Sequence, residues 1–156
     1  MNLTVPPNGS AQSSGDTVCA HMARRYVHTC IRVLDPERSV RFYEALGYER
    51  RGKLQFETAF NVYMGLPGDS DTLELTVNIG RDQPYDLGDG YNHIALTVDD
   101  LDGVLAGLAG QGIEPEKPPF HPGGRPEVGR ICFVQDPDGY RIELIDGGEF
   151  RTPQDP

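Results

Sequence analysis

Four short runs of the chain alternate apolar and polar residues, the pattern of a β-strand with one buried face. They cover residues 27–34, 71–78, 92–98 and 140–146. Because successive side chains of a strand point to opposite sides, each run has an apolar face for packing and a second, polar face. The polar faces carry histidine, glutamate, arginine and asparagine. We therefore expect the sheet to curl around them as a cup or a cleft.

Two further stretches carry the signals that begin and end a helix. The first covers residues 36–46, follows Asp35 as N-cap, has proline at its first position and stops before a glycine. The second covers residues 101–111, follows Asp99 or Asp100, and has its apolar residues on one face. Internal glycines weaken the second helix, so tertiary packing must hold it.

The order of these elements occurs twice along the chain. Residues 26–35 align without a gap with residues 91–100, and the alignment resumes further on after a short insertion in the second copy. In this sequence alignment His28 corresponds to His93 and Glu74 corresponds to Glu143. Each copy predicts the order βαβββ, in which the strands after the helix lie at about 52–56, 58–64 and 71–78 in the first copy and at about 113–117, 129–135 and 140–146 in the second.

The repeated residues form a candidate metal site. Two neutral imidazoles and two carboxylates supply an N₂O₂ ligand set for a divalent transition metal, with water completing the shell. Ni²⁺, Co²⁺, Mn²⁺ and Fe²⁺ fit such a set, and so does Zn²⁺. The alternative interpretation is a pair of buried His–Glu ion pairs without a metal. Repetition favours the metal: a solitary histidine is usually structural, but the same histidine and glutamate at equivalent places of both copies make a two-fold site.

These observations predict an α+β fold. Two tandem βαβββ modules, residues 26–80 and 91–146, form a curved mixed sheet with a cup-like metal site, and the helices lie on its outer face. Together the modules make one domain over residues 26–148. Residues 1–25 are polar, rich in serine, glycine, asparagine and proline, and lack periodicity, so we expect a flexible leader. Residues 149–156 are expected to form a flexible tail.

Composition restricts the partners and the compartment. The formal net charge of −10 would repel phosphates, so neither nucleic acid nor an anionic membrane surface is expected as a partner. The sequence contains neither an apolar run long enough to cross a membrane nor an apolar leader. Its three cysteines are spread out and odd in number, which fits a reducing cytoplasm better than a disulfide framework.

From Tyr26 to about Asp146 the chain resembles the glyoxalase I (lactoylglutathione lyase) branch of the vicinal oxygen chelate superfamily. The motifs that carry the resemblance are HTCIRV, RSVRFYEALGY, LELTVN, GYNHIALTVDD and FVQDPDGYRIELI. The resemblance implies four metal ligands, at His28, Glu74, His93 and Glu143. It also implies that Arg32 and Asn78 bind the γ-glutamyl end of a glutathione-like substrate.

The resemblance further implies a reaction. In this branch a hemithioacetal, formed from a thiol and a 2-oxoaldehyde such as methylglyoxal, is isomerised to a 2-hydroxyacyl thioester. Glu143 is expected to be the main base, with Glu74 in a supporting role. The short segment between Gly47 and Leu73 is similar to the compact bacterial class, which favours Ni²⁺ or Co²⁺ over Zn²⁺ and forms homodimers.

Two alternatives of other classes stay open. One is a different enzyme on the same scaffold, a ring-cleaving dioxygenase that needs iron and O₂ or an epimerase that needs a CoA ester. The other is a drug-binding resistance protein that holds no metal. The full set of two histidines and two glutamates is the glyoxalase I pattern, and it makes that function the leading hypothesis.

Overall fold

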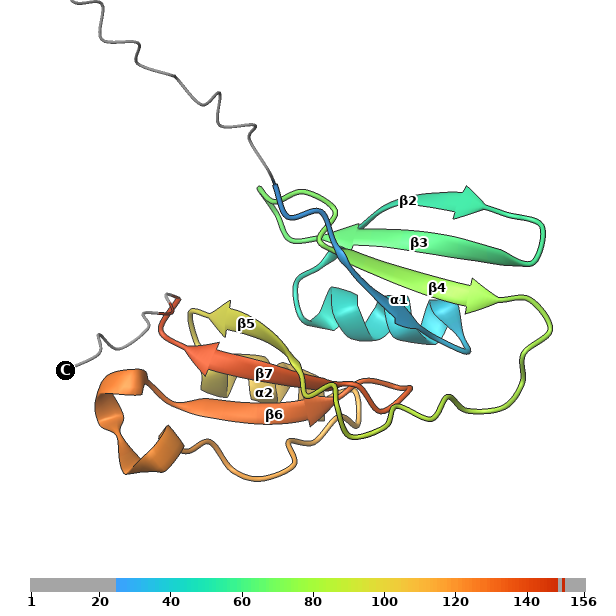
Figure 1. Ribbon diagram of the computed structural model, residues 1–156. Helices are drawn as coiled ribbons and strands as arrows, with labels where there is room; N and C mark the ends of the chain where they lie inside the picture. Colours follow the sequence, from blue (N-terminus) through green and yellow to red (C-terminus); the bar gives the residue numbers. More distant parts are fainter. Residues whose placement is uncertain (1–24, 149, 151–156) are drawn as a thin grey trace, which may run out of the picture.

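The computed structural model describes residues 25–148 and Phe150, so the predicted leader and tail lie almost entirely outside the described residues (Figure 1). Both predicted helices form, each after an aspartate N-cap. The elements are, in order, β1 (Thr29–Arg32), α1 (Pro36–Ala45), β2 (Glu49–Gln55), β3 (Ala59–Gly65), β4 (Leu73–Asn78), β5 (Ile94–Val98), α2 (Leu101–Ala109), two 3₁₀ turns (Pro122–Gly124 and Pro126–Val128), β6 (Ile131–Gln135) and β7 (Arg141–Asp146).

The strands form two mixed sheets, one from each copy of the repeat (Figure 1). The first has the order β1-β4-β3-β2 and the second the order β5-β7-β6. In each sheet the first strand of the module pairs in parallel with the last, β1 with β4 and β5 with β7. A helix covers one face of each sheet. The predicted α+β fold of two repeated modules is thus confirmed.

One predicted strand does not form. The segment 113–117 meets β6 through a single backbone hydrogen bond, from Glu116 N to Phe133 O at 2.8 Å, and Phe120 forms a lone bridge with Ile131. The prediction of a strand here was wrong. Residues 113–120, IEPEKPPF, contain three prolines, one of them inside the predicted strand, and a proline has no N–H to donate to a β-ladder. The segment therefore follows the edge of β6 without joining the sheet.

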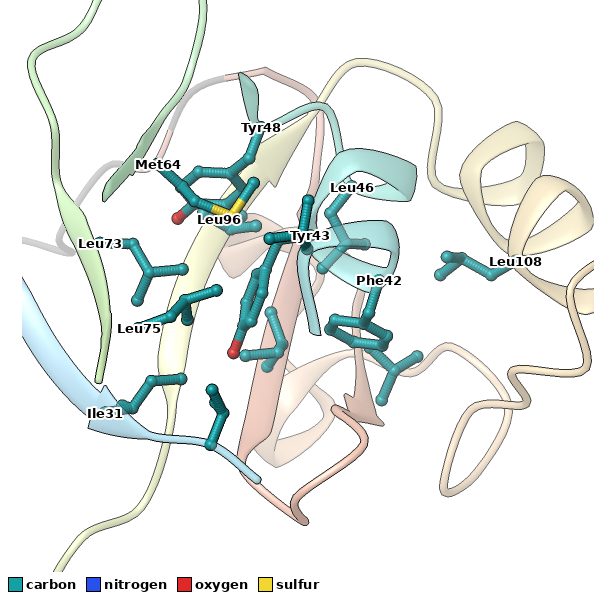
Figure 2. Close-up of a cluster of buried hydrophobic side chains, with 14 of the residues drawn as sticks. Ile31, Phe42, Tyr43, Leu46, Tyr48, Met64, Leu73, Leu75, Leu96 and Leu108 are labelled. Carbon is teal, nitrogen blue, oxygen red and sulfur yellow. The ribbon is translucent and has the colours of Figure 1, made fainter. Parts of the chain in front are cut away.

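A single apolar core runs through both modules (Figure 2). Helix α1 turns Phe42 and Tyr43 into it, and the Tyr43 ring lies among side chains of the first sheet and Leu96 of the second. Tyr43 is fully buried, yet its hydroxyl is satisfied, because it donates to Asp136 Oδ2 at 2.9 Å. The two modules of one chain are thus joined by shared packing and by a buried hydrogen bond.

The turn between β6 and β7, residues 136–139, fastens the second module to the first, and we call it the turn latch. Asp136 is 5% exposed and accepts the backbone N–H groups of Asp138 at 2.9 Å and Tyr140 at 2.8 Å as well as the Tyr43 hydroxyl. Burial raises the pKa of the Asp136 carboxyl, although these hydrogen bonds oppose the shift. Asp138 accepts Leu34 N at 3.1 Å. The latch therefore satisfies donors of both modules.

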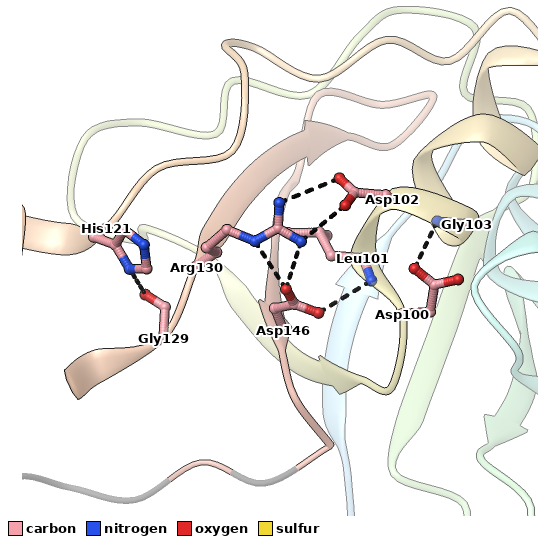
Figure 3. Close-up of polar contacts among 8 residues, drawn as sticks. All are labelled: Asp100, Leu101, Asp102, Gly103, His121, Gly129, Arg130 and Asp146. Carbon is pink, nitrogen blue, oxygen red and sulfur yellow. Dashed lines mark hydrogen bonds and ion pairs between the residues drawn. The ribbon is translucent and has the colours of Figure 1, made fainter. Parts of the chain in front are cut away.

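Arg130 ties the end of the last strand to the start of α2 (Figure 3). Its guanidinium donates to Asp146 Oδ2 at 2.7 Å and to Asp102 Oδ2 at 2.9 Å. Asp146 in turn accepts the Leu101 backbone N–H at 3.2 Å, one of the donors that a helix start leaves free. Hydrogen bonds from Arg130 hold the pKa of Asp146 below its ordinary value.

No helix in the described part of the chain is both long enough and apolar enough to span a bilayer.

Replacing Tyr43 with phenylalanine tests the turn latch. The ring would stay packed, but Asp136 would lose its side-chain donor while buried, which is expected to lower the free energy of unfolding by about 1–3 kcal/mol. Urea denaturation measures the change. Tyr48→Phe is the matched control, since its ring also lies in the core but, among the described residues, its hydroxyl forms a hydrogen bond with Thr72 and not with a buried carboxylate. Equal losses in both variants would contradict the latch.

Replacing Asp146 with asparagine tests the Arg130 contact through its pH dependence. Because the folded-state pKa of Asp146 is depressed, its stabilising effect is present above the unfolded pKa, about 4, and is lost as the pH falls through the folded pKa. The difference in unfolding free energy between wild type and Asp146→Asn, about 1 kcal/mol at neutral pH, should shrink below about pH 4. Urea titrations from neutral to acidic pH measure it, and a difference independent of pH would refute this account.

Candidate metal centre

The first predicted ligand pair comes together at the start of the first sheet. His28 directly precedes β1, and Glu74 lies on β4, the parallel neighbour of β1. His28 Nε2 lies 3.4 Å from Glu74 Oε2. The His28 side chain is 30% exposed and that of Glu74 is 11% exposed. Parallel pairing of β1 with β4 thus makes a half-site from residues far apart in the sequence.

The second pair repeats this arrangement. His93 directly precedes β5, Glu143 lies on the parallel neighbour β7, and His93 Nε2 lies 3.0 Å from Glu143 Oε2. Asn92 Oδ1 accepts from Arg141 Nη1 at 3.2 Å and lies 2.6 Å from His93 Nδ1. Since this oxygen is an acceptor, Nδ1 of His93 is the donor, and a neutral ring in this orientation turns its Nε2 lone pair toward Glu143. This is the tautomer that a metal ligand needs.

The spacing within each half-site fits a metal ion. A carboxylate oxygen and an imidazole lone pair repel each other unless a proton or a cation lies between them. A transition metal binds histidine nitrogen and carboxylate oxygen at about 2.1 Å each, so two adjacent ligands lie about 3.0–3.4 Å apart. The observed separations of 3.4 and 3.0 Å agree with that range.

The two half-sites do not meet in one chain. Among the residues that the structure describes, no group of three or more histidine, cysteine, aspartate or glutamate side chains is close enough to hold a metal ion. Each half-site therefore offers one nitrogen and one oxygen ligand. The four predicted ligands come as two pairs.

Glu74 lies among polar side chains. Thr76 Oγ1 is 3.3 Å from Glu74 Oε1, and Cys30 Sγ is 3.2 Å from the same hydroxyl. Burial pushes the pKa of Glu74 upward, but hydrogen bonds from Tyr63 and Cys30 and the charge of His28 outweigh it, so the pKa lies below its ordinary value. Glu74 is held as a carboxylate, the form that binds a metal.

The two predicted substrate-binding residues lie at the same end of the first sheet and share a neighbour. Asn78 donates to the Tyr85 hydroxyl at 2.9 Å. Tyr85 and Arg32 line one pocket of about 370 Å³, together with Cys30 and Tyr140. Its position next to Cys30 puts the pocket beside the first half-site.

Several residues at the site were missed by sequence reasoning. Asn92 is next to a predicted ligand and orients it. Tyr85 and Tyr140 reach the pocket from the connection between the modules and from the end of the turn latch. The only sequence signal for Asn92 was its adjacency to a repeated histidine. Tyr85 has none, because it lies outside the repeat.

A pocket of about 540 Å³ between α1 and the second module contains none of the predicted ligands. Its lining includes Arg38 and Arg41 of α1 and, from the second module, Glu114 and Glu116. His121 also stands apart from the half-sites, since its Nδ1 pairs with Gly129 O at 3.0 Å within its own loop (Figure 3). The predicted metal ligands therefore lie at the two half-sites and not in this pocket or beside His121.

Comparison with known proteins places these features in a family. A family model described as "Glyoxalase/Bleomycin resistance protein/Dioxygenase superfamily" matches residues 25–144. A probable lactoylglutathione lyase of Synechocystis is 39% identical over 127 residues, which are 76% of this chain and 92% of that protein. The lactoylglutathione lyase of Escherichia coli O157:H7 is 37% identical over 130 residues, 78% of this chain and 92% of that one. A probable chloroplastic lactoylglutathione lyase of Arabidopsis thaliana is 36% identical over 83% of this chain, which spans only 38% of the plant protein.

Solved structures agree with the sequence relatives. The glyoxalase I of Leishmania major, described as trypanothione-dependent, superposes with a TM-score of 0.67 at 34% identity, covering 80% of this chain and 88% of that one. Glyoxalase I of Zea mays superposes with a TM-score of 0.70 at 32% identity, covering 83% of this chain and 46% of the maize chain.

Proposed function

Because this chain belongs to the glyoxalase/bleomycin resistance protein/dioxygenase superfamily, we propose that it is a glyoxalase I. It isomerises the hemithioacetal of methylglyoxal and glutathione to a 2-hydroxyacyl thioester and so removes a toxic aldehyde. The observation that carries the proposal is the pair of His–Glu half-sites at equivalent places of the two modules. The relatives that this chain covers almost completely are named lactoylglutathione lyases, which favours this reaction over ring cleavage, epimerisation or drug binding.

The active form is proposed to be a homodimer. One chain offers two half-sites that do not meet, and a two-fold axis would let the first module of one chain face the second module of its partner. Two complete sites of two histidines and two glutamates would result. Large apolar side chains of the first module, Leu54, Phe56 and Ile79, are about half exposed in one chain and are suited to contact with a partner. Sedimentation should give twice the 17.2 kDa chain mass, and a monomer that is fully active would contradict the dimer.

The family implies a divalent metal ion, and His28, Glu74, His93 and Glu143 are the residues proposed to hold it. When bound, such an ion supplies Lewis acidity that stabilises negative charge on the substrate oxygens. Nickel or cobalt is proposed over zinc, because the segment between the first module's helix and β4 is as short as in the compact bacterial class. The free thiols of Cys30 and Cys132 fit the reducing cytoplasm, where we place the protein.

The protein's own residues bind the substrate and move its proton. Arg32 and Asn78 are proposed to bind the charged γ-glutamyl end of glutathione beside the first half-site. That contact fixes C1 of the hemithioacetal near the carboxylates. Glu143 takes the proton from C1 and returns it to C2, acting first as base and then as acid. Glu74 stays in place as a ligand and supports the transfer.

Replacing Glu143 with glutamine is expected to lower kcat by about 10²–10⁴-fold, because an amide cannot accept the C1 proton. The amide oxygen still binds a metal weakly, so part of the metal content should remain. The thioester product is followed by its ultraviolet absorbance with methylglyoxal and glutathione as substrates. Glu114→Gln, an exposed glutamate of the same module, is the control and should leave kcat unchanged. Near-normal turnover by Glu143→Gln would exclude Glu143 as the base.

Removing the metal with a chelator should abolish turnover, because the four ligands alone carry no Lewis acid. Adding back Ni²⁺ or Co²⁺ is expected to restore more activity than adding Zn²⁺. Metal analysis of the purified protein and reactivation assays with each ion measure this preference. Activity that survives complete removal of metal would contradict the proposed chemistry, and full restoration by Zn²⁺ alone would contradict only the preference for nickel or cobalt.

A further inference from the structure

The two glutamates of the candidate metal centre have unlike surroundings, although the repeat makes their positions equivalent. In the first module, Glu74 pairs across the sheet with Cys30 on one side and Tyr63 on the other. Thr76 follows it on the same face and pairs with Asn61. Every one of these neighbours is able to form a hydrogen bond.

The equivalent positions in the second module are mostly apolar. Glu143 pairs with Ala95 on one side and with Phe133 on the other. Ile145 follows it on the same face and pairs with Ile131. In the described part of the chain, the one side chain paired with Glu143 is His93, through its ring nitrogen at 3.0 Å. Arg141, two residues earlier on the same face, adds a positive charge nearby but donates its hydrogen bonds to Glu116 and Asn92.

The polar side chains around Glu74 form a connected network centred on Thr76. The Thr76 hydroxyl lies 3.3 Å from Glu74 Oε1, 3.0 Å from Asn61 Oδ1 and 3.2 Å from Cys30 Sγ. Asn61 is buried, and its Nδ2 lies 3.4 Å from the Tyr63 hydroxyl. Since both oxygens are acceptors, the single hydroxyl proton of Thr76 is shared between Asn61 Oδ1 and Glu74 Oε1, while the Cys30 thiol is able to donate to the hydroxyl oxygen. Threonine is branched at Cβ, and these contacts leave it little freedom to turn away. The carboxylate beside it is correspondingly restricted.

We propose that Thr76, supported by Asn61 and Cys30, is a positioning residue that keeps Glu74 on the metal, and that the second module lacks this device so that Glu143 is free to turn toward substrate. The inference rests on the proposed function and adds to it the physical basis for the unequal roles of the two glutamates. Partners of this kind fix the orientation of a metal ligand without touching the metal. A carboxylate without them exchanges more easily between metal and substrate.

Replacing Thr76 with valine removes the hydroxyl and keeps the shape and the β-branch. Metal-free protein is titrated with Ni²⁺ in competition with a chromogenic chelator, a readout that does not depend on turnover. Thr76→Val is expected to bind Ni²⁺ about 10–100-fold more weakly than wild type. Thr76→Ser, which keeps the hydroxyl, should restore most of the affinity, whereas a purely structural role of the side chain would not be rescued in this way.

The second module provides the matched control. Thr97 lies on β5, on the face of His93, and makes no side-chain hydrogen bond to Glu143 in the described structure. Thr97→Val should leave the Ni²⁺ affinity within about twofold of wild type, because its hydroxyl orients no ligand. Equal losses in Thr97→Val and Thr76→Val would overturn the one-sided positioning.

The remaining outcomes separate this inference from the proposed function. If wild type binds Ni²⁺ and turns over the hemithioacetal, but Thr76→Val binds Ni²⁺ as tightly as wild type, the positioning role is overturned and the function stands. If wild type binds Ni²⁺ without turnover and Thr76→Val binds it more weakly, the positioning role stands and the glyoxalase function falls. A wild-type protein that binds no divalent ion overturns both.

Discussion

The parallel pairing of the first and last strands in each module is the constraint on which the site depends. It places the residue that precedes the first strand beside the beginning of the last one, and so brings each histidine within 3.4 Å or less of its glutamate. Side chains of a strand alternate between faces, so a slip of one residue in this register would turn each glutamate into the apolar core. The buried leucines on both sides of Glu74 oppose such a slip. Core packing therefore specifies the geometry of the half-sites.

The turn latch fixes the arrangement of the two modules, and this arrangement decides whether one chain is able to assemble a complete set of four ligands. Asp136 and Asp138 accept donors from α1 and from Leu34, which lies between β1 and α1, and the shared core adds apolar contact between the modules. The modules are thereby held with their half-sites apart. A rigid chain that carries two separate halves of one ligand set is suited to assembly with a second copy. The proposed dimer is thus based on the way in which a single chain packs.

The sequence predicted the repeat, the order of the elements and the pairing of each histidine with its glutamate, because all of these follow from alternation and internal alignment. It wrongly predicted a strand at 113–117, where Pro115 and the two prolines that follow the segment lack the N–H groups that a sheet needs. The separation of the half-sites could not be predicted from the sequence, since alternation within a strand does not determine how two modules are oriented relative to each other. The contact of Asn61 with Thr76 likewise depends on the register of β3 against β4, which the sequence of the connection between these strands does not specify.

The most direct test of the central claim, that each site combines the first module of one chain with the second module of another, is complementation between two inactive variants. One carries His28→Ala with Glu74→Ala, and the other carries His93→Ala with Glu143→Ala. Each alone lacks half of every site. In a mixed dimer, one of the two sites would receive all four ligands, so co-expression should restore activity to about a quarter of the wild-type level if the chains pair at random. Mixed dimers that form but stay inactive would contradict the account.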